Sequence, residues 1–207
     1  MSKPDTSIDP RILESAKSEF LSCGYEKAST NVICKNAGVT SGALYKRFAG
    51  KDELFCALVA PAAEEFKSIL ASEQEDFHSL SDQEKESAAI GSPSEGDGFI
   101  NYVYSYFDTF KLLIECSEGS SYESYMSDLV EILVGSTERF MSGSNHEAVI
   151  LGKKATHETI HILISSYLYG LFEPVVQGMN RDEALLYTEQ LKYFFNVGWA
   201  DILRLKK

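Results

Sequence analysis

Apolar residues recur at helical spacing along almost the whole chain. The first such segment has Asp9 at its start and Gly24 at its end, with Ile12, Ala16 and Phe20 on one face between them. Asp is favoured just before a helix and Gly just after one, so these two residues predict the bounds of a first helix. We find no convincing run of alternating residues bounded by hairpin turns, and the pattern predicts an all-α fold.

Three more helices are predicted from the residues that would start them. A short helix follows Ser29, a third starts after Gly38 with Thr40 as its N-cap, and a fourth starts after Gly50. Pro61 lies inside the fourth helix, where its ring and its missing N–H should kink or split that helix.

The middle of the chain changes in composition. Residues 72–98 are acidic and Ser-rich, and helix-breaking residues gather near their end. These residues are Gly91, Pro93, Gly96 and Gly98. The composition predicts the tail of a helix followed by a loop.

Three longer helices are expected after an aromatic-rich segment at 99–116. The last of them is signalled most clearly, because Asn180 can cap it and Glu183 stands at the third position of a capping box. The expected ranges are 122–141, 146–173 and 181–206.

Residues 29–48 have the pattern of two short helices joined by a tight turn. Gly38 supplies the residue that tolerates positive φ, and Cys34 and Ala37 are small where the helices would cross. Apolar positions of the second helix then face inward, which leaves small and polar residues at its start facing outward. A helix with such a start can enter the major groove of DNA, so the segment predicts a helix-turn-helix.

This stretch resembles the TetR (tetracycline-repressor) family of transcriptional regulators. The resemblance covers about residues 9–58 and weakens beyond them. It lies in Phe20-Leu-Ser-Cys-Gly-Tyr25, in Ala37-Gly-Val-Thr-Ser-Gly-Ala-Leu-Tyr45, in Phe48 and in Lys51-Asp-Glu-Leu-Phe55.

The resemblance implies an architecture and a function. It implies a three-helix DNA-binding domain with a helix-turn-helix at 1–50, and a helical effector-binding and dimerisation domain at 51–207. It also implies a homodimeric, ligand-responsive transcriptional repressor that binds near-palindromic double-stranded operator DNA. Four phosphate contacts carry over by position, namely Ser29, Thr40, Tyr45 and Lys51.

Base contacts are expected from the outward side of the same helices. Ala43 can meet a thymine methyl group and Lys46 can donate to guanine acceptors. The full set of candidates is Ser41, Gly42, Ala43, Lys46 and Asn31. Two residues depart from the family pattern. Val32 stands where an acidic capping partner is common, and Ser41 stands where a basic residue often occurs, which suggests modest intrinsic affinity.

The charge distribution agrees with a nucleic-acid contact at one end only. The 207 residues carry a net charge of −12, yet residues 1–60 hold eight basic and seven acidic side chains, which leaves a net −13 on the remainder. The acidic remainder would be repelled by DNA. Residues 1–10 are polar and unlike a signal peptide, and the apolar runs fall short of the roughly 20 residues of a membrane span, so we expect a cytoplasmic protein. The four cysteines lack CxxC spacing and are expected to be reduced.

One segment offers an enzymatic alternative. Residues 157–161 read His-Glu-Thr-Ile-His, the pattern in which two histidines one helical turn apart bind zinc and the Glu activates water. A zinc hydrolase also needs a third ligand, and the only other histidines are His78 and His146. The family resemblance instead makes His157 and His161 interface or pocket-lining groups. We therefore expect no enzyme, no metal and no cofactor, with the zinc hydrolase as the alternative.

An effector pocket is expected in the aromatic-rich region. Aromatic residues between 99 and 110 fall on more than one helical face, more than a single core stripe requires, although plain core explains any one of them as well. The candidate ligand-binding residues are Tyr102, Tyr106, Phe110, Glu115, Tyr122, Tyr125 and Met126. The surrounding acidity leans toward a cationic or neutral small molecule, and a solvated face explains it equally.

The last two helices carry dense apolar stripes that suggest a dimer interface. Packed against a second subunit, they would form the four-helix interface that the resemblance implies. The stripes consist of Ile160, Leu163, Ile164, Tyr167, Leu168 and Leu171, and of Leu185, Leu191, Phe194, Phe195, Trp199 and Leu203. An effector that prefers another spacing of the two DNA-reading helices would release the operator, with the fourth helix as a lever and Pro61 as its hinge. A helical interaction module without DNA is a further alternative.

Overall fold

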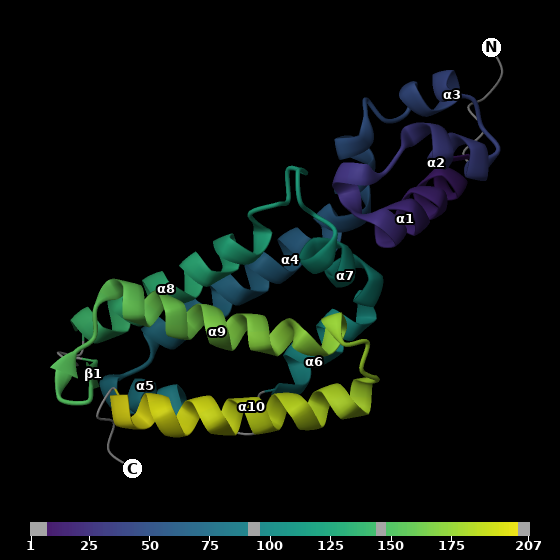
Figure 1. Ribbon diagram of the computed structural model, residues 1–207. Coiled ribbons are helices and arrows are strands. Elements are labelled where there is room, and N and C mark those ends of the chain that lie inside the picture. The colour runs from purple at the N-terminus through teal and green to yellow at the C-terminus, as the bar shows by residue number, and fades with distance from the viewer. Residues whose placement is uncertain (1–7, 91–95, 144–147, 203–207) are drawn as a thin grey trace. The chain divides into compact units, whose positions relative to one another are not determined.

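The computed structural model describes residues 8–90, 96–143 and 148–202, and these residues form helices with one small hairpin. Figure 1 shows the elements in chain order. They are α1 Ile8–Lys27, α2 Thr30–Ala37, α3 Ser41–Tyr45, α4 Lys51–Ser79, α5 Asp82–Ile90, α6 Gly96–Ser105, α7 Phe107–Glu115, α8 Tyr125–Gly143, β1 Val149–Ile150, β2 Lys153–Lys154, α9 His157–Val176 and α10 Arg181–Ile202. The predicted all-α fold class is confirmed.

The chain divides into two compact units. The first consists of the described residues up to Glu65 together with Tyr106–Tyr125, and the second consists of Phe66–Ser105 and the described residues from Met126 onward. Helix α4 contributes its first half to one unit and its second half to the other. The sequence-based boundary after residue 50 stays a prediction.

The core of the first unit forms where α1 meets α2, α7 and the start of α4. Ile12 and Phe20 of α1, Ile33 of α2 and Phe55 of α4 are all fully buried. The Phe20 and Phe55 rings meet edge to face, with centroids 5.2 Å apart. Gly24 has a φ of 77°, so the helical path breaks there, as the sequence predicted.

The second unit has an aromatic core between its helices. Phe66 of α4, Phe99 of α6 and Phe172 of α9 pack with ring centroids 5.2 to 6.0 Å apart. Helices α9 and α10 lie against each other, and the rings of Tyr167 and Phe195 join them at 5.0 Å. The predicted capping box of α10 is confirmed. The Glu183 N–H donates to Asn180 Oδ1 and the Asn180 N–H donates to Glu183 Oε2, both at 3.0 Å.

Several predicted boundaries are wrong. Helix α5 occupies part of the acidic stretch that was expected to be a loop, and Gly96 and Gly98 belong to α6. Helix α4 continues through Pro61, which therefore does not split it. Gly91 and Pro93, the other markers of the expected loop, lie outside the described residues.

The predicted helix at 146–173 starts later than expected. A two-stranded antiparallel hairpin fills 149–154, and α9 begins only at His157, with Thr156 as its N-cap. The expectation of no strand is wrong at this one place among the described residues. The proposed start at His146 falls in a part of the chain that the structure does not describe.

Helix α9 is the most apolar helix of the second unit. Among the described residues it is the one helix whose length and mean hydropathy would allow it to cross a membrane. Seven of its residues are buried in the unit, among them Ile160, Leu168 and Phe172. The core helix of a folded unit can have the same apolar composition as a membrane span.

Candidate nucleic-acid interface

The turn between α2 and α3 is built on a left-handed glycine. Gly38 has φ 66° and ψ 37°, and its N–H donates to the carbonyl of Lys35 at 3.2 Å. The next N–H, that of Val39, donates to the carbonyl of Cys34 at 3.0 Å. A side chain at position 38 would be strained in this conformation, which explains the glycine that the sequence analysis singled out.

Helix α3 is short and depends on its cap and on one buried side chain. The Thr40 hydroxyl accepts a hydrogen bond from the Ala43 N–H at 3.2 Å, as predicted for an N-cap. Leu44 is fully buried against the core of the first unit, whereas Tyr45 beside it is 53% exposed. Five residues of helix are too few to be stable alone, so this packing fixes the position of α3.

The outward side of the corner carries the predicted DNA-contacting residues. Thr40, Ser41, Gly42, Tyr45, Lys46 and Asn31 are exposed, and Ser29, Ala43 and Lys51 are half-buried. The hydroxyl of Tyr45 lies 3.3 Å from that of Thr30, within hydrogen-bonding distance. The structure therefore brings the start of α2 and the end of α3 together on one exposed surface.

The start of α2 is capped from outside its own segment. The Ser29 side chain makes no capping hydrogen bond, and Val32 has no polar atom to return one. Glu19 of α1 takes that role, because its Oε1 accepts the Ser29 N–H at 3.0 Å. Sequence reasoning missed Glu19, since a cap supplied from ten residues earlier leaves no local pattern.

Lys51 is held inside the first unit. Its ammonium group donates to the carbonyls of Tyr25, Glu26 and Ala28 at 2.7, 2.9 and 3.4 Å, and it lies 4.4 Å from the centre of the Tyr25 ring. These carbonyls mark the end of α1, where a positive charge is stabilised by the helix dipole. A phosphate contact by Lys51 stays a prediction, and the structure adds a role in joining the end of α1 to the start of α4.

Arg47 faces away from the exposed start of α3. It forms an ion pair with Asp9 and donates to the carbonyl of Ala43 at 3.2 Å. Its guanidinium thus ties the end of α3 to the start of α1. Of the two adjacent basic residues, Lys46 is the exposed one.

The α2–α3 corner lies in a segment that is similar to known proteins. Residues 12–58 match the family model described as "Bacterial regulatory proteins, tetR family". The segment at 12–58 is thus similar to the tetR family of bacterial regulatory proteins. The match ends within α4, and it contains the whole of α2, the Gly38 turn and α3.

One curated relative and two solved structures are also similar to this chain. The HTH-type transcriptional regulator UidR of Escherichia coli K12 is 30% identical over 93 residues, which are 45% of this chain and 37% of UidR. The chain thus matches well under half the length of this relative. A TetR-like transcriptional regulator from Rhodococcus sp. RHA1 has a TM-score of 0.57 at 18% identity, covering 95% of this chain and 100% of that one. PfmR, a TetR-family transcriptional regulator from Thermus thermophilus, gives 0.55 at 16% identity, with 95% and 96% covered. At such low identity the two structures show a shared fold.

Five predicted effector residues belong to the first unit. Phe110 is fully buried, Tyr106 is 42% exposed, and Glu115 pairs with Lys111 at 3.6 Å. The hydroxyls of Tyr122 and Tyr125 donate at 3.0 Å to Glu64 Oε1 and to the carbonyl of Ala63. Burial and the neighbouring Glu64 raise the pKa of Tyr122 to about 12.

The other two predicted effector residues belong to the second unit. Tyr102 is half-buried beside Phe66, with ring centroids 5.7 Å apart, and Met126 is buried. A cavity of about 750 Å³ lies in the first unit at the ends of α1 and α7. A second cavity, of about 420 Å³, is the apolar groove along α9 and α10 that is described below. Glu115 lines the larger cavity, and the other six predicted residues line neither of the two. Their role in binding an effector stays a prediction.

The His-Glu-Thr-Ile-His segment lies at the start of α9, and each histidine is paired with a carboxylate of α8. His157 Nδ1 lies 2.6 Å from Glu138 Oε1, and His161 Nε2 lies 3.2 Å from Glu131 Oε1. The hydrogen bond that His157 donates to the Glu138 carboxylate raises the pKa of His157 above its ordinary value. Within the described ranges no three metal-ligating side chains are grouped to hold an ion. Nothing here supports the zinc hydrolase, and the proteins that resemble this chain are regulators.

The predicted interface stripe on α9 is partly wrong. Ile160, Ile164, Leu168 and Leu171 are buried in their own unit and cannot contact a second subunit. The exposed apolar residues of these helices are Ile162 and Tyr169 on α9 and Leu186, Tyr193, Phe194 and Val197 on α10. Leu203 lies outside the described residues.

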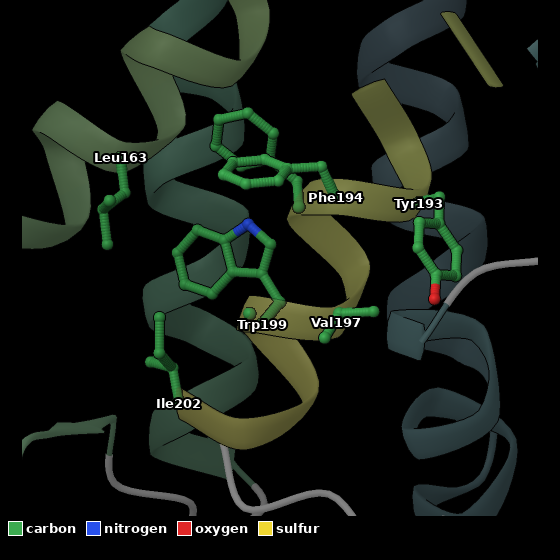
Figure 2. Close-up of a pocket in the computed structure, with 8 residues that line it drawn as sticks. Leu163, Tyr193, Phe194, Val197, Trp199 and Ile202 are labelled. Atoms are coloured by element: carbon green, nitrogen blue, oxygen red, sulfur yellow. The ribbon is translucent and has the colours of Figure 1, made fainter. Parts of the chain in front are cut away.

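An apolar groove runs along the exposed side of α10. Phe194, Trp199 and Ile202 extend toward Leu163 of α9, while Tyr193 and Val197 lie on the other side of α10 (Figure 2). Tyr193 and Phe194 are 74% and 72% exposed, unusual for large apolar side chains. Exposed apolar patches of this kind mark places where another molecule packs.

Proposed function

We propose that this chain is a sequence-specific DNA-binding transcriptional regulator, a homodimeric repressor released from its operator by a small-molecule effector. The observation that carries the proposal is the α2–α3 corner. Its buried side is fixed by Leu44 and the Gly38 turn, and its exposed side presents the small and polar start of α3. A rigid helix with such a start fits the major groove of duplex DNA.

Base recognition is assigned to the exposed start of α3. Ser41 and Gly42 let the helix approach base edges closely, Ala43 meets a thymine methyl group, and Lys46 donates to guanine acceptors. Asn31 reaches the same groove from α2. Ser41 contributes no charge where a basic residue often stands in the family, so specificity would rest on close fit more than on electrostatic attraction.

Phosphate contacts are assigned to both ends of the corner. The hydroxyls of Ser29, Thr40 and Tyr45 are placed to bind backbone oxygens, and the contact between Tyr45 and Thr30 holds the tyrosine ring over the start of α2. Lys51 contributes mainly by fixing the start of α4 beside the end of α1, since its ammonium group is hydrogen-bonded to three carbonyls there. The backbone N–H groups at the start of α4 would then face the phosphate.

A second copy of the chain is the proposed partner of the exposed α10 face. Tyr193, Phe194 and Val197 would become buried in a two-fold interface, and each fully buried side chain of this size contributes about 1.5–3 kcal/mol. Two-fold symmetry presents two α3 helices to successive major grooves, so the operator would be near-palindromic. Such a regulator works in the cytoplasm, with no contact with the membrane.

The effector is assigned to the aromatic-rich stretch of the sequence at 99–126. Candidate contacts are Tyr102, Tyr106, Phe110, Glu115, Tyr122, Tyr125 and Met126. Helix α4 continues without a break from the first unit into the second, which makes it the natural element to transmit an effector-induced change. Release requires only that the effector bind more tightly to a dimer geometry that DNA does not accept.

Selection from genomic DNA tests the proposal. Purified protein is mixed with fragmented genomic DNA, bound fragments are recovered at fixed salt, and they are sequenced. We expect a short motif with two-fold symmetry and half-sites separated by about one helical turn. Recovery of random sequence, or binding that disappears entirely at moderate salt, would contradict sequence-specific recognition.

A further inference from the structure

The hairpin between α8 and α9 has an unusual tip. Val149 pairs with Lys154 and Ile150 with Lys153, and the ladder is extended by a hydrogen bond of 2.8 Å from the Ala155 N–H to the Ala148 carbonyl. Ala148 is buried, so the base of the hairpin is anchored. The two turn residues, 151 and 152, both have positive φ, at 50° and 78°. Two such residues make the tight turn that suits a two-residue hairpin.

Leucine is an unexpected residue for the first turn position. Leu151 is the only non-glycine residue with positive φ in the described part of the chain, and a leucine is sterically strained in this conformation. Its side chain is also 99% exposed, so it gains nothing from packing within its own chain. The isolated chain therefore carries both a strained backbone and an unburied apolar side chain at one point.

The tip lies at the end of the second unit where the apolar groove lies. Helices α9 and α10 run side by side, with Tyr167 against Phe195 and with Leu163 and Ile202 lining the same groove. The end of α10 is thus beside the beginning of α9. The hairpin joins that beginning directly, because Ala155 is two residues before His157. The base of the hairpin thus belongs to the end of the second unit where Leu163 and Ile202 line the groove.

We propose that the hairpin at 149–154 is an arm that docks its Leu151 tip on a second copy of this chain. The proposal rests on the homodimer of the proposed function and adds a contact outside the α10 face. Charge favours this occupant, since Lys153 is exposed beside the tip and residues 61–207 carry a net −13. A second copy thus carries an excess of acidic residues over this range, and this excess attracts a basic arm.

The size of the contact also favours a second copy over a lipid surface. One leucine side chain contributes too little to hold a protein on a membrane alone. The same contribution is large as an addition to an interface that already exists. Burial of the Leu151 side chain against a second copy would also offset the strain of the turn.

Two variants separate docking from local folding. Leu151→Asp removes the apolar contact, and we expect the dimer dissociation constant to rise about tenfold in sedimentation equilibrium. Leu151→Gly also removes the side chain but suits positive φ, so it should raise the dissociation constant similarly while leaving the melting temperature of the monomer unchanged or higher. A dissociation constant unchanged in both variants would overturn the arm.

Photo-crosslinking locates the contact directly. A benzophenone amino acid at position 151 of the full chain should give a covalent dimer on illumination, and the same group at Val32, which is 39% exposed on the first unit, should not. Absence of a covalent dimer from position 151, in a sample shown by sedimentation to be dimeric, would also overturn the proposal. If the unmodified chain is itself a monomer, the homodimer of the proposed function fails and the arm fails with it.

Discussion

Two exposed helical surfaces of this chain differ in chemistry, and the difference separates two kinds of partner. The start of α3 is small and polar and lies over a buried leucine, whereas the face of α10 exposes Tyr193, Phe194 and Val197. The first surface is held by its own unit and needs no further burial. The second has apolar area that water does not favour. A rigid polar surface suits the edges of base pairs, and an apolar one suits another copy of the protein.

The largest expected effect concerns the exposed face of α10. Phe194→Asp combined with Val197→Asp should weaken the dimer by at least about 3 kcal/mol, or about a hundredfold, because two buried apolar side chains would become charged. Both residues are exposed in the single chain, so folding should be retained. Sedimentation equilibrium measures the change, and Glu189→Gln on the same helix is the control. A double variant that stays fully dimeric would place the interface elsewhere.

Two adjacent residues of α3, one buried and one exposed, should differ in their effect on stability. Leu44→Ala should lower the free energy of unfolding by about 3 kcal/mol, because it opens a cavity in a fully buried position. Tyr45→Ala, one residue on, should change it by less than about 0.5 kcal/mol, because that side chain is half exposed. Thermal and denaturant unfolding measure both. Equal losses would mean that α3 does not present one face and bury the other.

Two glycines of the corner should respond with opposite signs. Gly38→Ala should lower the free energy of unfolding by about 1 kcal/mol, since an alanine is strained at φ 66°. Gly42→Ala should raise it by roughly 0.5 kcal/mol, because position 42 is helical and a Cβ there meets only the Thr40 hydroxyl at 4.0 Å. A melting series of the two variants beside the unmodified chain tests the pair. Loss of stability in both would argue against the left-handed turn as the constraint.

The smallest effect concerns pH and the second unit. The pKa of His157 is raised by Glu138, so the protonated histidine stabilises the folded state, fully at pH values below the ordinary 6.5. This contribution is lost as the pH rises through the raised pKa. The melting temperature should therefore fall slightly from pH 6 toward pH 8, and Glu138→Gln should flatten that slope. A slope unaffected by Glu138→Gln would assign it to another group.

Local signals in the sequence predicted the Gly38 turn and two helix caps well. Gly38, the Thr40 cap and the capping box of α10 depend on residues within a few positions of each other, and all three are found. What was missed depends on distant residues. The capping of Ser29 by Glu19 and the binding of Lys51 to three carbonyls of the α1 end arise only once the helices pack.

The second unit was harder to predict, because α9 is apolar on most sides. Periodicity finds such a helix but cannot say which side meets its own core, so Ile160 and Leu168 were assigned to a dimer interface and are buried instead. The hairpin was missed for a related reason. Its turn uses a leucine where Asn or Gly is expected, and its two-residue strands are too short to show alternation.

Docking of α3 in the groove is tested most directly by a binding titration with Tyr45→Ala. Fluorescence anisotropy at fixed salt, on the operator obtained by selection, should show affinity reduced at least about tenfold for Tyr45→Ala. Tyr169→Ala, which removes a similarly exposed tyrosine from the second unit, should bind as the unmodified chain does. Equal affinity of Tyr45→Ala and the unmodified chain would contradict the assigned surface.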